Sequence, residues 1–182
     1  MKKKIVVGLV LALMLVSTFG AFAETKSKVY PWMASYNDPG HLNIYGAIGY
    51  YYGGLSFTAG AEFMITKFDL AGIPLELGVM GQGIIGFDNY YASGVDWGVA
   101  PLVSLHWGVD FGSPWKFDWY AALGLGIYGG PYQSFFFGNS VGFGFASYEG
   151  VIWELSNNLG VMLEYGYIGW TSVYGIGVTL KL

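Results

Sequence analysis

The stretch V-Y-G-I-G-V-T-L-K-L, residues Val173 to Leu182, ends the chain and decides how the rest is interpreted. Its apolar side chains alternate with glycine or polar residues at a period of two, which is the pattern of a β-strand with one apolar face. A strand that ends a chain needs a partner for each of its two backbone edges. Pairing with the first strand of the chain would supply the second partner and close the sheet.

The same alternation recurs in seven further runs upstream: Leu42 to Tyr51, Leu55 to Ile65, Pro74 to Phe87, Val95 to Trp107, Phe117 to Tyr128, Val141 to Leu155 and Leu159 to Tyr167. The runs are joined by three to twelve residues, too few for helical crossovers between parallel strands. The sequence therefore predicts an all-β fold, an eight-stranded antiparallel up-and-down barrel over residues 41–182. We expect a turn at Lys67 to Gly72 and a bulge at Pro101, because proline removes a donor from the strand ladder.

The sixth run contains one exception to the pattern. Glu149 falls on the apolar side of the strand, unless the strand bulges or its register slips near Ser147. The sequence leaves both arrangements open.

Charge is scarce in this chain of 182 residues. Charged residues make up 11%, against about 25% in ordinary globular domains. All eight basic residues are lysines, the formal net charge is −4, and there is no cysteine. This balance predicts no nucleic-acid partner and no disulfide or thiolate metal site, and we expect no cofactor and no metal.

The N-terminus has the three parts of a secretory signal peptide, predicted to span residues 1–23. Lys2 to Lys4 form a basic region, Ile5 to Val16 an apolar region, and Ala21-Phe22-Ala23 a cleavage site. An N-terminal membrane helix is the alternative, although the apolar run is shorter than the roughly 20 residues that a helical span requires. Residues 24–40 read as an exposed periplasmic leader, with a short edge strand or a docked segment as the alternative.

Two kinds of closed barrel are built from eight antiparallel strands in sequence order. They differ in whether the polar face or the apolar face of the strands lines the inside. A soluble lipocalin-type barrel keeps its apolar residues inside, whereas a membrane barrel turns them to lipid. Here the face opposite the apolar one is rich in glycine and alanine. These small residues suit a narrow lumen and are poorly suited to a surface in contact with water. Aromatic residues near strand ends match the girdles at membrane interfaces: Tyr50, Tyr51, Tyr52, Tyr90, Tyr91, Trp107, Trp115, Trp119, Tyr165, Tyr167 and Trp170. The membrane barrel is favoured, and a soluble secreted binding barrel remains the alternative.

With a signal peptide, alternating strands, girdles and a terminal strand, the chain resembles the small eight-stranded outer-membrane barrels of the OmpA-transmembrane, OmpX and OmpW type. The resemblance covers Leu42 to Leu182 and is one of pattern. It implies a location in the cell outer membrane, with membrane lipid and the barrel-assembly machinery as partners. The chain departs from the family in ending on Leu182, where the assembly signal usually has an aromatic residue.

Polar side chains of the inward face are predicted to form a network that fills the lumen. They are Glu62, Glu76, Gln82, Asp96, Ser104, His106, Asp118, Glu164 and Lys181. The excess of acids over lysine also suits a cation site, but the structural role is favoured.

Ser104 and His106 share this face and could serve a barrel lipid hydrolase. Lipid A deacylases, by resemblance, use a His, a Ser and an acid in the order H-x-S on a lipid-facing surface; here the order is reversed and the face is the inner one. We therefore predict no catalytic residues and a non-enzymatic protein, with the hydrolase as the alternative.

The longest connection, Gly129 to Ser140, carries Phe135, Phe136 and Phe137. An exposed apolar triplet could contact a partner, lipid or a small hydrophobic ligand, or it could fold over the barrel mouth as a lid. The predicted roles are thus membrane structure, surface contact, or passage of a small hydrophobic molecule.

Overall fold

The computed structural model describes residues 30–51, 54–89, 93–138 and 140–182. The predicted signal peptide and the girdle residues Tyr52, Tyr90 and Tyr91 lie outside this part of the chain. In the described residues, no helix is long and apolar enough to cross a membrane.

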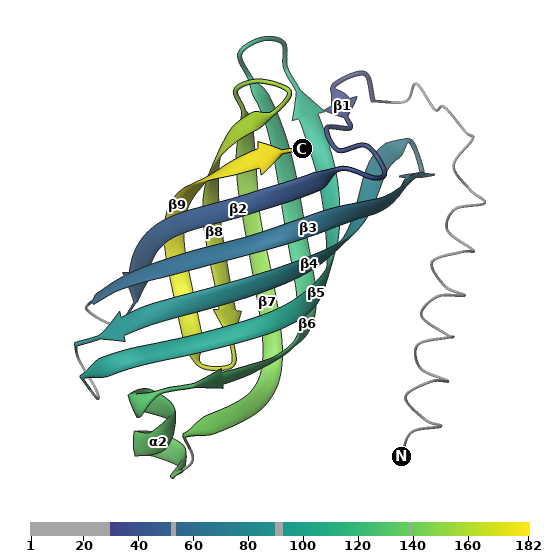
Figure 1. The fold of residues 1–182 in the computed structure, drawn as a ribbon. Coiled ribbons are helices and arrows are strands. Elements are labelled where there is room, and N and C mark those ends of the chain that lie inside the picture. The colour runs from purple at the N-terminus through teal and green to yellow at the C-terminus, as the bar shows by residue number, and fades with distance from the viewer. Residues whose placement is uncertain (1–29, 52–53, 90–92, 139) are drawn as a thin grey trace, which may run out of the picture.

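Eight strands of the described chain form a closed antiparallel barrel (Figure 1). They are β2 (Leu42–Tyr51), β3 (Gly54–Leu70), β4 (Ile73–Asp88), β5 (Gly94–Asp110), β6 (Lys116–Gly129), β7 (Val141–Glu154), β8 (Leu159–Ile168) and β9 (Thr171–Lys181). Each strand pairs with the next, and β9 pairs with β2 from Lys181 opposite Asn43 to Tyr174 opposite Tyr50. The predicted fold class is confirmed, because the terminal strand finds its second partner in the first strand of the barrel.

The two faces of the strands are sorted as the membrane barrel requires. Along β2, Asn43 and Tyr45 are buried in the lumen, whereas Ile44 and Ile48 are 41% and 47% exposed on the outer surface. The other strands follow the same alternation. The soluble lipocalin-type alternative is wrong, because that barrel would place the apolar side chains inside.

Large side chains occupy the lumen, and glycines make room for them. Tyr51 and Tyr148 are at most 1% exposed. A Cβ at Gly86 would lie 2.5 Å from the ring of Tyr51, and one at Gly166 would collide with the ring of Tyr148. The inward glycines therefore let the tyrosine rings cross the barrel. The prediction that Tyr51 belongs to an interfacial girdle is therefore wrong, because its ring lies in the lumen.

Two local expectations differ from the structure. β3 does not end before Lys67: a bulge between Met64 and Thr66 leaves Ile65 unpaired, and the strand continues to Leu70. At Pro101 the β5–β6 pairing lapses between Val99 and Leu102, yet the register is the same on both sides. The missing donor of Pro101 interrupts the ladder without inserting a residue, so the predicted bulge is absent there.

Part of the predicted leader is docked on the barrel through Met33 to Asn37, whereas Tyr30, Trp32 and Asp38 are exposed. β1 (Met33–Ala34) pairs with Val109 and Gly108 of β5, and the hydroxyl of Tyr36 donates to the Val109 carbonyl over 3.0 Å. This edge is open because the pairing of β4 with β5 ends at His106. The edge-strand alternative therefore holds for residues 30–40, whereas residues 24–29 lie outside the described chain.

The predicted loop Gly129 to Ser140 contains a short helix, α2 (Pro131–Phe137). Proline begins the helix, and Gly138 ends it in the left-handed conformation at φ 70° with its N–H donating to the Ser134 carbonyl. Figure 1 shows α2 at one end of the barrel and the C-terminus at the other, next to β1. We call these the α2 end and the terminal end.

Candidate functional site

All nine side chains of the predicted lumen set lie inside the barrel, and each is at most 5% exposed. Their hydrogen bonds divide them into separate groups along the barrel axis. Both polar ends of the Gln82 side chain are buried without a hydrogen-bond partner. The lumen is thus polar and packed, and the hydrogen bonds of the described residues join its polar side chains in several groups.

Glu62 is the centre of the largest group. Its carboxylate accepts hydrogen bonds from the hydroxyls of Tyr45 and Ser104. Nε2 of His106 lies 2.9 Å from Glu62 Oε1, and Nδ1 lies 3.0 Å from Asp118 Oδ2. His106 therefore bridges two buried carboxylates, and the hydroxyl of Ser104 is directed to an acid.

Asn37 of the docked leader closes this group at the terminal end. Its side-chain amide donates to Glu76 Oε2 over 2.6 Å and to Asp118 Oδ2 over 2.8 Å, and its backbone N–H donates to Glu76 over 3.1 Å. Ligand atoms of Glu76, His106 and Asp118 lie within 4.8 Å of one another, a donor set of one imidazole and two carboxylates that divalent metals accept. Asn37 donates to both carboxylates and His106 contacts Asp118, which favours the structural role, while Asp118 Oδ1 is buried with no hydrogen-bond partner in the described part of the chain.

The remaining acids pair locally. Glu164 accepts 2.7 Å hydrogen bonds from the hydroxyls of Thr58 and Tyr120. Near the terminal end, Lys181 Nζ lies 2.6 Å from Glu154 Oε1. Its ammonium therefore compensates an acid outside the predicted set, and not the central ones.

Sequence reasoning missed several partners of the predicted acids. Asn43 and Tyr45 share the inward face with Glu62, so the period of two could have identified them. Asn37 carried no such signal, since it lies outside any strand and reaches Glu76 only through the fold.

The docked leader is also held by charge. Lys67 Nζ lies 2.7 Å from Asp38 Oδ1, and this hydrogen bond and charge lower the pKa of the Asp38 carboxyl. Burial, reinforced by nearby carboxylates, raises the pKa of the Tyr36 hydroxyl. The hydroxyl therefore stays protonated and remains a donor to Val109.

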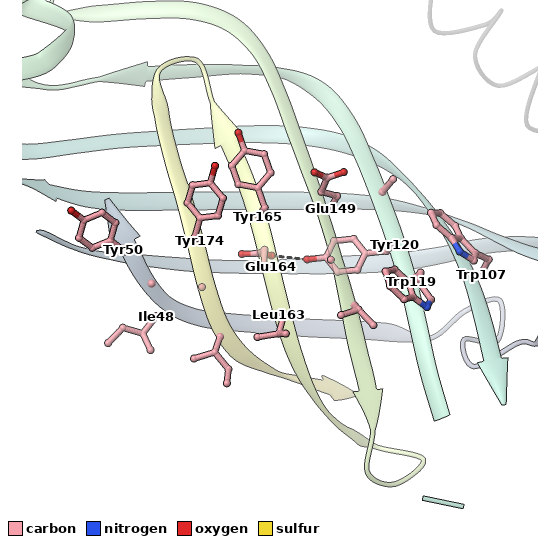
Figure 2. Close-up of a pocket in the computed structure, with 16 residues that line it drawn as sticks. Ile48, Tyr50, Trp107, Trp119, Tyr120, Glu149, Leu163, Glu164, Tyr165 and Tyr174 are labelled. Atoms are coloured by element: carbon pink, nitrogen blue, oxygen red, sulfur yellow. Dashed lines mark hydrogen bonds between the residues drawn. The ribbon is translucent and has the colours of Figure 1, made fainter. Parts of the chain in front are cut away.

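The outer surface carries a groove, which we call the aromatic groove (Figure 2). Its volume is about 710 Å³. It lies between two rows of outward side chains that run across the strands. One row, on β2, β9, β8, β7 and β6, is Tyr50, Tyr174, Tyr165, Glu149 and Ala121; the other, which continues to β5, is Ile48, Ile176, Leu163, Val151, Trp119 and Trp107.

Glu149 lies in this groove because β7 keeps its register. Glu149 pairs with Ala121 on β6 and Tyr165 on β8, and neither ladder shifts along the strand. The slip or bulge near Ser147 does not occur, so the carboxylate is exposed on the apolar outer surface. In Figure 2 it points outward beside the ring of Tyr165, whereas Glu164 points inward to Tyr120.

Aromatic rings give the groove a recognisable chemistry. The rings of Tyr165 and Tyr174 are stacked with centroids 4.5 Å apart. Faces of tyrosine and tryptophan attract cations, and a carboxylate among them adds a full negative charge. The groove can therefore accept an apolar chain together with one positive group.

Comparison with known proteins supports the fold. No protein-family model matches the chain, and no curated protein sequence matches it. The outer membrane enzyme PagL is 12% identical, with a TM-score of 0.55 over 77% of this chain and 98% of that chain. A de novo designed transmembrane β-barrel is 19% identical, with a TM-score of 0.48 over 81% of this chain and 100% of that chain. Ail, the attachment invasion locus protein of Yersinia pestis, is 14% identical, with a TM-score of 0.37 over 78% of this chain and 95% of that chain. The chain has the fold of the small transmembrane β-barrels.

Proposed function

We propose that the chain is a non-enzymatic barrel of the bacterial outer membrane that presents α2 as a contact surface. The observation that carries this proposal is the contrast between a filled lumen and an exposed aromatic helix. Buried side chains cross the barrel, whereas Phe135 and Phe136 are 68% and 47% exposed. The side chain of Phe137 is outside the described atoms.

The two ends of the barrel support an orientation. Outer-membrane barrels have short periplasmic turns and longer extracellular loops. The longest connection, which contains α2, lies at the α2 end, and the docked leader lies at the terminal end. We therefore place α2 on the outside of the cell and residues 30–40 in the periplasm.

α2 is anchored to the barrel on one side and exposes Phe135 and Phe136 on the other. The backbone N–H of Tyr132 donates to Asp96 Oδ1 over 3.1 Å, and Gln133 is buried. The ring of Phe136 packs on Tyr132 with centroids 4.6 Å apart, and Phe135 packs edge-on against Phe136. This arrangement supports a contact surface over a lid, because a lid would turn the Phe rings into the barrel mouth.

Passage of a hydrophobic molecule through the lumen fits the structure less well. An eight-stranded barrel leaves room for little more than its own side chains, and here those side chains are tyrosines and hydrogen-bonded acids. The wild-type protein should show no single-channel conductance in planar bilayers.

The contact role is tested with cells that display the protein. Replacement of both rings, Phe135→Ser with Phe136→Ser, should lower adhesion of the cells to a hydrocarbon phase to the level of cells without the protein. The matched control is Phe143→Ser, which removes an exposed ring from the wall of the barrel. Equal adhesion of the double variant and wild type would refute the contact role.

A lipid-acting enzyme is the second candidate, favoured by the fold likeness to the enzyme PagL and by a carboxylate on the outer surface. The histidines argue against it. The chain has two, of which His106 is in the lumen and His41 lies near the terminal end, so neither reaches Glu149. Hydrolysis of membrane lipid by the wild type, lost in Ser104→Ala, would establish the enzyme; no hydrolysis by the wild type would remove it.

A further inference from the structure

Glu149 is a charged residue inside the apolar band of the barrel. On its own strand, Phe143 and Phe145 lie toward the α2 end, and Val151 and Trp153 lie toward the terminal end. A charged residue on the lipid face of a barrel is destabilising, more so for Arg or Lys than for Glu and most at mid-depth. The position therefore has a cost that a bound counter-charge would offset.

The described part of the chain does not supply that counter-charge. In the described residues, Glu149 forms no hydrogen bond or ion pair. Lys67 pairs with Asp38, Lys116 lies near Asp110 at the terminal end, and Lys181 is bound to Glu154 in the lumen. Within residues 30–182 as described, no lysine is therefore placed to neutralise Glu149, which leaves room for a positive group from another molecule.

The groove around Glu149 also offers space and cation-binding rings. Its volume, about 710 Å³, falls in the range of roughly 300–1,000 Å³ that is usual for ligand sites. Tyr165 and Tyr174 lie beside the carboxylate, and Trp119 and Trp107 line the groove on β6 and β5. Ile48, Ile176 and Leu163 belong to one of the two rows and form an apolar wall along which a hydrocarbon chain can lie.

We propose that the aromatic groove binds one single-chain amphiphile with a protonated amine. The ammonium pairs with the Glu149 carboxylate and contacts the tyrosine rings, and the hydrocarbon chain runs across the strands between the two rows. A zwitterionic phospholipid fits less well, because it brings a phosphate next to its amine and therefore next to Glu149. A second copy of the barrel fits less well too, because its described lysines lie near the strand ends or in the lumen.

A second groove on the same outer surface provides an internal control. It surrounds Pro101, has a volume of about 610 Å³, and is lined by Val99, Leu125, Ile127 and Phe143 together with small residues. No ionisable side chain lines it among the described residues. Apolar chains should occupy it only without saturation and without preference for an amine.

The experiment measures quenching of tryptophan fluorescence at pH 7 in neutral maltoside micelles. Three probes of equal chain length are compared: 11-bromoundecylamine, 11-bromoundecanol and 11-bromoundecanoate. The wild type should bind the amine saturably, with one equivalent per barrel, and at least 10-fold more tightly than the alcohol. Carboxylate binding should be weaker still, because Glu149 repels it.

Glu149→Gln keeps the shape of the groove and removes the charge, so the preference for the amine should fall below about 2-fold. Leu125→Gln, in the second groove, should leave that preference unchanged. Leu163→Trp fills the aromatic groove without touching Glu149, and it should abolish saturable binding of both amine and alcohol. Each variant is first checked for a folded barrel by its electrophoretic mobility without boiling.

Three results would overturn the proposal: equal affinity of the wild type for amine and alcohol, an undiminished preference in folded Glu149→Gln, or a change of oligomeric state in that variant without a change in binding. A change of oligomeric state without a change in binding would show that the groove serves as a contact surface between barrels. The proposal depends on the barrel fold and not on the role of α2, so the adhesion experiment and this one can fail separately.

Discussion

At the scale of the residue, His106 holds the central lumen group together. It bridges Glu62 and Asp118, and its ring stacks on Tyr120 with centroids 5.5 Å apart. Removing one partner of a buried ion pair typically costs about 3–5 kcal/mol, because the remaining charge is left uncompensated. The buried acids of the lumen therefore depend on this one ring more than on the lysine that the barrel also encloses.

His106→Phe should lower the free energy of unfolding by about 2–4 kcal/mol. The phenyl ring keeps the stacking on Tyr120 and loses both nitrogen contacts, so the loss reports on the carboxylates. The measurement is the midpoint of urea unfolding in lipid vesicles. Met162→Leu, a buried swap of similar volume, serves as the control and should cost less than about 1.5 kcal/mol. A midpoint for His106→Phe equal to that of this control would contradict the bridging role.

At the scale of the element, the docked leader completes the terminal end of the barrel. β1 pairs with β5 beyond the point where the pairing of β4 with β5 ends. Asn37 donates hydrogen bonds to two acids of the lumen. The leader is thus a part of the fold whose position depends on one buried amide.

Asn37→Ala should release this element while the barrel stays closed. Loss of the side-chain amide removes one hydrogen bond from Glu76 and one from Asp118, which costs roughly 1–3 kcal/mol. Amide hydrogens of Met33 and Ala34 should then exchange at least 10-fold faster, whereas those of β8 should be unchanged. Asn157→Ala, in the exposed β7–β8 turn, is the matched control. Unchanged exchange at β1 would show that backbone pairing alone holds the leader.

At the scale of the whole molecule, closure between the first and last strands decides whether a barrel exists. Gly177 of β9 faces β2 so closely that a Cβ there would collide with the Gly46 carbonyl and lie 2.6 Å from the Ala47 Cβ. The backbone of β2 cannot move away from an added Cβ as a flexible side chain could. The seam therefore requires a residue without a Cβ at this position.

Gly177→Val should prevent closure of most of the protein. The wild type, after an alkaline carbonate wash of membranes, should stay in the pellet and change its mobility in SDS electrophoresis on boiling. The Gly177→Val protein should lose the form that depends on heating. Val178→Ala, the neighbouring residue that points to the outside, should retain it. A heat-dependent shift in Gly177→Val would show that the seam adapts to a larger residue.

The sequence by itself determined the class of fold and the sorting of its faces. A period of two needs only the backbone geometry of a strand, so Ile44 and Tyr45 were assigned to opposite faces without knowledge of their neighbours. The small and polar residues of one face then indicated that this face lines the lumen and that the apolar face is turned to lipid. The nine lumen residues followed from the same rule, because each belongs to a run whose phase is clear.

Only the tertiary structure decided which groups meet. Asn37 reaches Glu76 and Asp118 through a docking that no local pattern encodes, and the loop before β7 became a helix because of its proline start and glycine stop. Glu149 could face either way until the ladders of β6 and β8 set the register of β7. The aromatic groove is likewise invisible in the sequence, since its rows are assembled from six strands whose relative heights depend on pairing across the whole barrel.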